Sequence, residues 1–283
     1  MPKYLKWLGL GCLVLLVILA LVLFIANKMS KGDGETGTTR STGDISAVEN
    51  SEPTVSKTTD EAQPESSIAT IPLPQINIED QPTVLTTLIE SNGTTYEELA
   101  QKGCSQLICV VADGTSATIR FFAYSDGVWT EDKKLSCEGY VGRSGVEEDK
   151  TEGDGCTPSG LYGIGKAFYV KKEPETALDV FQITSDTYWV DDPDSQYYNQ
   201  RVEGLEKKDW DSAEHMIDYA AYQYGFVVEY NLMAEYNRGS AIFFHIGSRP
   251  TAGCIATEQK KVLAYLAELD KERNPCVLIL RVQ

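Results

Sequence analysis

The first apolar pattern in the chain is an unbroken run from Trp7 to Ala26, in which no side chain is charged. A helix of about 20 residues spans about 30 Å, the thickness of the hydrocarbon layer of a bilayer. A cleaved signal peptide is the alternative, but its apolar core is shorter and ends in a small-x-small site, which residues 21–27 lack. The pattern therefore predicts one N-terminal transmembrane helix, a membrane anchor within residues 1–26.

Polar positions dominate residues 27–99, a segment rich in Gly, Ser, Thr, Glu and Pro with four basic against thirteen acidic residues. Low hydrophobicity with one dominant charge sign buries too little apolar surface to offset the entropy of the chain. We expect a low-complexity acidic stalk or linker, in which residues 84–89 have the composition of a short helix at the edge of the next domain. Acidic Asp33 and Glu35 after the apolar run favour an orientation with the N-terminus inside the cell.

Apolar positions in residues 100–283 follow the pattern of short strands separated by turns. The Asp113-Gly114 and Asp126-Gly127 pairs predict β-hairpins, because an Asp-Gly pair suits the tight turn between antiparallel strands. One helix is predicted from Thr257 to about Lys271, where apolar residues recur at helical spacing. The fold class is therefore mainly β with a few helices. The expected strands are 107–112, 117–123, 128–130, 135–141, 226–230, 241–244 and 277–282.

Composition narrows the possible functions. The 283 residues carry a formal charge of −17, which argues against a nucleic-acid partner because phosphate binding requires a Lys and Arg surface. Two histidines, His215 and His245, exclude a His-rich metal site. For His215, a structural role or a place in the substrate cleft is favoured over catalysis, because a lone histidine is usually just hydrogen bonded.

The strongest candidate chemistry lies between His245 and Cys254. A cysteine attacks an acyl carbon as the thiolate and needs a nearby base or an electropositive setting. His245 follows the expected strand 241–244, and Cys254 precedes the expected helix at Thr257. The N-terminal end of that helix is expected to favour the thiolate and to offer amides to an oxyanion. The alternative for an isolated Cys and His pair is a buried structural cysteine and a hydrogen-bonded core histidine.

Several ordered motifs decide between these alternatives. The chain contains His245-Ile-Gly-Ser248 followed by Thr251-Ala-Gly-Cys254-Ile, and further upstream Val141-Gly-Arg-Ser-Gly145 and Gly153-Asp-Gly-Cys-Thr-Pro-Ser-Gly160. Residues 191–199 and 212–216 add two more blocks. Together these stretches resemble the L,D-transpeptidase catalytic domain of the YkuD type, a family that cross-links bacterial peptidoglycan through a cysteine nucleophile. The similarity covers roughly residues 105–283.

The resemblance implies a β-sandwich or mixed-sheet catalytic domain that acts on peptidoglycan stem tetrapeptides. Cys254 would attack the carbonyl of the third residue, release the terminal D-Ala and form a thioester, which an amine of a second stem converts into a 3→3 cross-link. His245 would be the general base and acid, and Gly247 or Ser248 would orient its imidazole. Gly253 would lie in the oxyanion region. No metal or organic cofactor is implied.

Candidate substrate-binding residues complete the expected site. Many family members carry a second His before the Gly-Cys pair and an Arg two positions after the Cys, where this chain has Ala252 and Ala256. His245 is therefore the one local base, and another cation is expected to orient the substrate, with Lys150 among the alternatives. The expected substrate contacts are Arg249, Thr251, Arg143 and Tyr198.

Other functions stay open at this point. Water in place of the amine gives an L,D-carboxypeptidase, and a non-catalytic cell-wall-binding module would use the same fold. A sortase also combines an anchor, a stalk and Cys-His chemistry, but Thr251-Ala-Gly-Cys254 does not match its Thr-Leu-x-Thr-Cys motif. The expected location is the cell membrane, single-pass, with the catalytic domain outside the cell. Pairing among Cys104, Cys109, Cys137, Cys156 and Cys276 is open, as is the oligomeric state.

Overall fold

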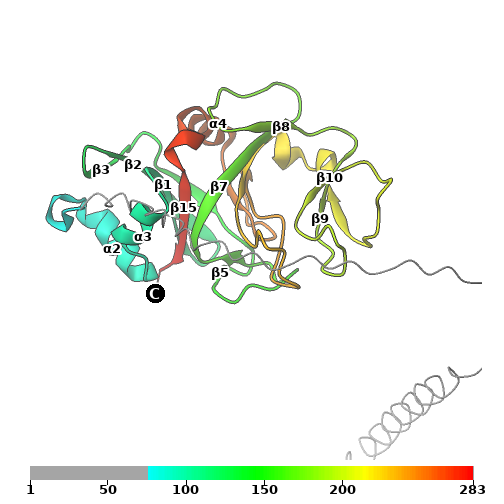
Figure 1. Cartoon of the computed structure of the whole chain (residues 1–283), viewed down its shortest axis with the longest axis horizontal. Coiled ribbons are helices and arrows are strands. Elements are labelled where there is room, and N and C mark those ends of the chain that lie inside the picture. Colours follow the sequence, from blue (N-terminus) through cyan, green and yellow to red (C-terminus); the bar gives the residue numbers. More distant parts are fainter. Residues whose placement is uncertain (1–75, 283) are drawn as a thin grey trace, which may run out of the picture. The chain divides into compact units, whose positions relative to one another are not determined.

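The computed structural model describes residues 76–282, so the predicted anchor at residues 7–26 and most of the predicted stalk lie outside the described residues. Within 76–282, no helix is both long enough and apolar enough to cross a membrane. This part is mainly β with few helices, as the sequence predicts (Figure 1). The helices are α2 (Thr83–Asn92), α3 (Tyr96–Gln101) and α4 (Gln259–Glu268), with 3-10 turns η1 (Ile78–Asp80), η2 (Met216–Asp218), η3 (Ala220–Gln223) and η4 (Lys271–Arg273).

One mixed sheet forms the centre of the fold. Its order is β1-β15-β7-β12-β13-β14-β4-β2-β3, and β1 also pairs with β2, so the sheet closes on itself into a barrel. Most neighbours are antiparallel, but β1–β15, β13–β14 and β7–β8 are parallel. The strands of this sheet are β1 (Gln106–Asp113), β2 (Ser116–Ser125), β3 (Val128–Glu131), β4 (Cys137–Tyr140), β7 (Gly160–Tyr169), β8 (Val180–Gln182), β12 (Tyr224–Val228), β13 (Phe243–Ile246), β14 (Ile255–Thr257) and β15 (Cys276–Arg281).

Both predicted hairpins are confirmed. Strands β1 and β2 pair antiparallel along their whole lengths, and β2 pairs with β3 up to Ser125 and Val128. The two residues between them, Asp126 and Gly127, both have positive φ, 52° and 89°. That conformation belongs to the turn whose twist matches the twist of the flanking strands, which explains why an Asp-Gly pair occurs here.

Two short helices extend the folded part to before residue 100. Leu85 and Ile89 of α2 and Leu99 of α3 are buried, and they join an apolar cluster with residues of β1, β2 and β15. Figure 1 shows both helices beside β1 and β15. Asn92 also donates a hydrogen bond to the carbonyl of Ile279 in β15. The expected domain boundary at residue 100 thus falls inside α3. A helix that packs by one face needs only a few apolar residues per turn, so a largely polar segment can still belong to the folded domain.

The helix after the Cys254 region starts later than expected. Residues 255–257 form strand β14, and α4 begins only at Gln259. Val262, Tyr265 and Leu266 of α4 are fully buried in the largest apolar cluster, together with residues of β12 and β13. The helical spacing of apolar residues thus marks a helix that faces the core, but Thr257, the first residue of the predicted helix, belongs to β14.

Two small sheets lie outside the barrel. One has the order β10-β9-β11, and the other pairs β5 with β6. Their strands are β5 (Val146–Glu147), β6 (Thr157–Pro158), β9 (Thr187–Val190), β10 (Arg201–Glu203) and β11 (Ala213–His215). In Figure 1, β9 and β10 are at the end of the fold opposite α2 and α3. Of these strands, β11 contributes Glu214 to the wall of the cavity described next.

Candidate active site

Parallel pairing of β13 and β14 brings the predicted nucleophile and base to one place. In this pairing His245 is opposite Ala256, and Phe244 is opposite Ile255, the residue after Cys254. His245 lies within β13 rather than at the end of the expected strand. Both His245 and Cys254 line a cavity of about 950 Å³. The fold thus joins two residues that eight others, 246–253, separate in sequence.

The thiol of Cys254 is buried and held by backbone. Only 5% of the residue is exposed, and its Sγ accepts from the amide of Phe243 at 3.4 Å and donates to the carbonyl of Ala241 at 3.2 Å. Burial, followed by the negative charge of Glu214, raises the pKa of the thiol to about 12. The prediction that a helix N-terminus stabilises the thiolate of Cys254 is wrong, because strand β14 follows Cys254 and α4 begins only five residues later. In the free protein, Cys254 is a neutral thiol.

His245 is suited to accept a proton. Its Nδ1 lies 2.9 Å from the carbonyl of Ile246, so the neutral ring carries its hydrogen on Nδ1 and leaves Nε2 as an acceptor. Burial lowers the pKa of His245 below 6.5, which keeps the ring neutral near pH 7. Gly247 and Ser248 were expected to orient the imidazole, but the carbonyl of Ile246 is the group in contact. The ring of Tyr222 adds an edge contact at 5.3 Å between ring centroids.

Threonine hydroxyls shape the loop before Cys254. Thr251 Oγ1 accepts from the amide of Gly253 at 3.1 Å and donates to the carbonyl of Cys254 at 2.6 Å. The buried hydroxyl of Thr157 donates to the carbonyl of Gly253 at 2.7 Å and accepts from the amide of Gly142 at 2.8 Å. The structure therefore places Thr251 as a brace of the loop as well as in the cavity wall. The amide of Gly253 was expected to donate to an oxyanion, but it already donates to the hydroxyl of Thr251.

Gly253 has little room for a side chain. A Cβ at this position would lie 3.0 Å from the carbonyl oxygen of Cys156 and 3.2 Å from Cδ1 of Ile242. The loop containing Cys156 and Thr157 therefore packs directly against the residue before Cys254. Part of the Gly153–Gly160 motif therefore has a structural role, because its residues Cys156 and Thr157 pack against and hydrogen bond to the loop that precedes Cys254.

We expect Thr157→Val to lower the free energy of unfolding by about 1–3 kcal/mol, because the buried Gly142 amide and Gly253 carbonyl both lose their partner. Chemical denaturation of the purified protein measures the change. Thr130→Val on the exposed side of β3 is the matched control, with an expected change within about 0.5 kcal/mol. Equal midpoints for the two variants would show that the Thr157 hydroxyl does not stabilise this loop.

The other expected substrate contacts fall into two groups. Arg143, Ser248 and Arg249 line the cavity, as does Gly247. Tyr198 is not among the lining residues: it is buried, and its hydroxyl donates to Glu152 Oε2 at 2.6 Å and accepts from the amide of Gly239 at 2.9 Å. Tyr198 was expected to contact substrate, but its ring packs inside the fold.

Sequence reasoning missed the acidic side of the cavity. Glu214 in β11 accepts a hydrogen bond from the Tyr222 hydroxyl at 2.7 Å, and burial raises the pKa of its carboxyl to about 7. Burial also raises the pKa of Asp191, whose Oδ1 is buried without a partner. Glu152 lines the same cavity. Asp191 and Glu214 belong to the motif blocks at residues 191–199 and 212–216, but those blocks do not show that the carboxylates share a cavity with Cys254, because they come from separate parts of the chain.

The remaining histidine and cysteines lie elsewhere. His215 stacks on Tyr188, and its ring nitrogens contact Asp218 at 2.9 Å and the carbonyl of Ser185 at 2.7 Å, which is a structural role. All six cysteines of the described part are free thiols, so none of the pairings left open by the sequence is present there. Among residues 76–282, no three His, Cys, Asp or Glu side chains are grouped as metal ligands.

Comparison with known proteins identifies the family. A family model described as the L,D-transpeptidase catalytic domain (YkuD) matches residues 110–278. Because the match covers more than half of the chain, the chain belongs to this family, and the resemblance seen in its motifs is confirmed. No curated protein sequence matches the chain.

Two solved structures are similar to the chain. The crystal structure of the helical cell shape determining protein Pgp2 from Campylobacter jejuni has 18% identity and a TM-score of 0.37, and the match covers 63% of this chain and 48% of that chain. A lysine-to-alanine mutant of Pgp2 gives 17% identity and a TM-score of 0.35 with the same coverage. The match therefore spans about half the length of Pgp2.

Proposed function

We propose that the protein is an L,D-transpeptidase that acts on peptidoglycan stem tetrapeptides through a thioester on Cys254. The observation that carries the proposal is the placement of Cys254 and His245 in one cavity by the parallel pair β13–β14, in a chain of the L,D-transpeptidase catalytic domain family. A nucleophile and a base facing one cavity are the minimum machinery for acyl transfer.

The first half-reaction begins from neutral groups. The Cys254 thiol leaves the carbonyl of Ala241 and transfers its proton to Nε2 of His245, while the sulfur forms a bond with the carbonyl carbon of the third stem residue. Collapse of the adduct breaks the C–N bond to the terminal D-Ala. His245 gives its proton to the leaving nitrogen, and a thioester remains.

The second half-reaction restores the enzyme. A side-chain amine of another stem attacks the thioester carbonyl and gives a proton to His245. The C–S bond then breaks, the sulfur takes that proton back, and the new amide is the 3→3 cross-link. Water as the attacking group would give a carboxypeptidase instead. The amide of Cys254 is the candidate oxyanion donor, because within the described contacts it has no acceptor, whereas the Gly253 amide is bonded to Thr251.

The location follows from the predicted N-terminal segment. The uncharged run at residues 7–26 supports a single membrane anchor, with the following acidic segment and the domain on the cell-wall side. Deleting residues 1–26 is expected to move the protein from the membrane fraction to the soluble fraction. Recovery of the shortened chain in the membrane pellet after a salt wash would overturn the anchor.

The test of function uses the full-length protein in detergent with a purified disaccharide-tetrapeptide. Release of D-Ala together with dimers of the 3→3 type supports the transpeptidase. Release of D-Ala without dimers identifies the carboxypeptidase. Retention of the muropeptide on immobilised protein with no D-Ala release identifies a binding module and overturns the proposed function.

A further inference from the structure

Lys150 is the most unusual charged residue of the described part. Within residues 76–282 it is the one Lys or Arg that is buried, with 2% of its side chain exposed. Removing an ammonium from water costs several kcal/mol unless it is paired and hydrogen bonded. A lysine is rarely buried in this way, so its surroundings must compensate for the lost hydration.

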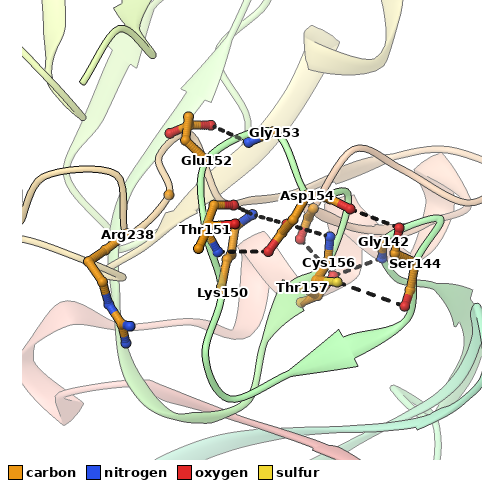
Figure 2. A network of polar contacts seen from close by, with 12 residues as sticks. Gly142, Ser144, Lys150, Thr151, Glu152, Gly153, Asp154, Cys156, Thr157 and Arg238 are labelled. Carbon is orange, nitrogen blue, oxygen red and sulfur yellow. Dashed lines mark hydrogen bonds and ion pairs between the residues drawn. The ribbon is translucent and has the colours of Figure 1, made fainter. Parts of the chain in front are cut away.

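One carboxylate holds the ammonium. Nζ of Lys150 donates to Asp154 Oδ1 at 2.7 Å and to the carbonyl of Thr151 at 3.2 Å (Figure 2). Asp154 is itself fixed by the amides of Cys156 at 2.8 Å and Thr151 at 2.7 Å. Burial alone would raise the pKa of Asp154, but the bonds from Lys150 and the two amides outweigh it and lower the pKa. Asp154 is therefore held as a carboxylate beside the Lys150 side chain.

The stem of Lys150 is held in place as well. A Cβ on Gly239 would lie 2.7 Å from Cε of Lys150, so the lysine packs directly across this glycine, whose φ is +100°. The amide of Gly239 donates to the hydroxyl of Tyr198, which in turn donates to Glu152. Tyr198, expected to contact substrate, instead fixes the backbone against which Lys150 lies.

This cation lies beside Gly253, the residue before Cys254. Nζ is 3.7 Å from the point where a Cβ on Gly253 would stand, and Lys150, Gly253 and Cys254 line the same cavity. An ammonium has three N–H donors, and Asp154 and Thr151 use two of them. Within the described contacts the third N–H has no acceptor, and Lys150 lines the cavity in which negative charge would form during acyl transfer.

We propose that Lys150 supplies the positive charge that stabilises the anionic forms of Cys254 and of its tetrahedral adduct. A positive charge is needed here because the other ionisable side chains of the cavity wall include three acidic ones, which disfavour a new negative charge: Glu152, Asp191 and Glu214. Arg143 and Arg249 also line it, but both are exposed, and exposed cations are screened by water. A buried cation acts through a lower dielectric and carries more weight at the same distance.

The role of Lys150 rests on the proposed role of Cys254 as nucleophile, but its test needs no peptide substrate. Iodoacetamide is a neutral reagent that reacts with the thiolate, so its rate at Cys254 near pH 8 follows the thiolate fraction. Peptide mass spectrometry separates Cys254 from the other cysteines. We expect Lys150→Met to slow alkylation of Cys254 by about tenfold, the equivalent of one hydrogen bond from a charged donor. A merely structural effect would loosen the site and speed the reaction.

Two further variants exclude other causes. Lys150→Met combined with Asp154→Asn removes the carboxylate that the single variant leaves unpaired, and it is expected to remain as slow as the single variant. Glu214→Gln removes a negative charge from the same cavity and is expected to speed alkylation. A rate restored in the double variant, or a rate unchanged or raised in Lys150→Met, overturns the role of Lys150. A protein that alkylates as expected but releases no D-Ala overturns the proposed function instead.

Discussion

Cys254→Ala is expected to release no D-Ala from a disaccharide-tetrapeptide and to form no cross-linked dimer. The substitution removes the only sulfur in the cavity wall, and nothing else in that wall combines a nucleophilic atom with a neighbouring imidazole. Loss of a covalent nucleophile leaves only the rate that binding and the oxyanion donor support, several orders of magnitude below that of the intact enzyme. Liquid chromatography of the muropeptides measures both products, and intact-mass spectrometry shows whether the acyl adduct forms.

A matched variant separates lost chemistry from lost folding. In Cys254→Ala the amide of Phe243 and the carbonyl of Ala241 lose their shared partner, so some loss of stability is expected. Cys254→Ser keeps a donor and an acceptor at this position and is expected to fold with wild-type stability while remaining inactive. Cys156→Ala in the adjoining loop is expected to keep activity. Cross-linking by either Cys254 variant would assign the nucleophile to another residue.

Elements of the fold that depend on neighbouring residues in the sequence could be predicted. The hairpin at Asp126 and Gly127 follows from a turn that needs positive φ at two successive residues. The core face of α4 follows from apolar residues at helical spacing. His245 and Cys254 were found because several ordered motifs around them resemble the L,D-transpeptidase family, whereas the Cys and His pair alone left a structural role open.

The parts that depend on distant contacts were not predictable. Residues 255–257 join the sheet because β13 pairs with them on one side and β4 on the other. Strand β4 is more than 100 residues away in the sequence, so the local pattern does not reveal this pairing. The composition of residues 84–89 predicts a short helix and α2 confirms it, but nothing local marks α3, whose Tyr96 and Leu99 are buried by packing on the cluster that includes β1 and β15. Lys150 and Glu214 belong to different loops and strands, and only the closed barrel brings both to Cys254.

The resting site is organised to keep its nucleophile neutral until a proton acceptor is in reach. Burial and the charge of Glu214 hold the thiol of Cys254 in its protonated form, with a pKa of about 12. Burial acts in the opposite sense on His245, whose lowered pKa leaves the imidazole free of a proton. Both shifts favour a neutral thiol beside a neutral imidazole over a thiolate–imidazolium pair, and this favours proton transfer that accompanies attack on the substrate. A general base is then required for the rate, and His245 is the one local candidate.

His245→Ala is therefore expected to lower kcat for D-Ala release by about 10²–10⁴-fold, the contribution of general base catalysis. The reason is that no other group lining the cavity is a neutral base beside Cys254. His245→Gln keeps more of the side-chain volume and is expected to be as slow. The chain offers its own control, because His215→Ala changes the only other histidine, which lies outside the cavity, and is expected to keep near-wild-type activity.

The pH profile of kcat/KM tests the same assignment without removing the residue. Since burial lowers the pKa of His245 below 6.5, its base form persists as the pH falls, and the acid limb of the profile is expected below pH 6.5. A histidine of ordinary pKa would already have lost half of its base form at pH 6.5. Glu214, with a pKa of about 7, titrates above this range, so the profile is read in Glu214→Gln as well. In that variant an acid limb that begins above pH 6.5 would show that the proton acceptor is not the buried imidazole of His245.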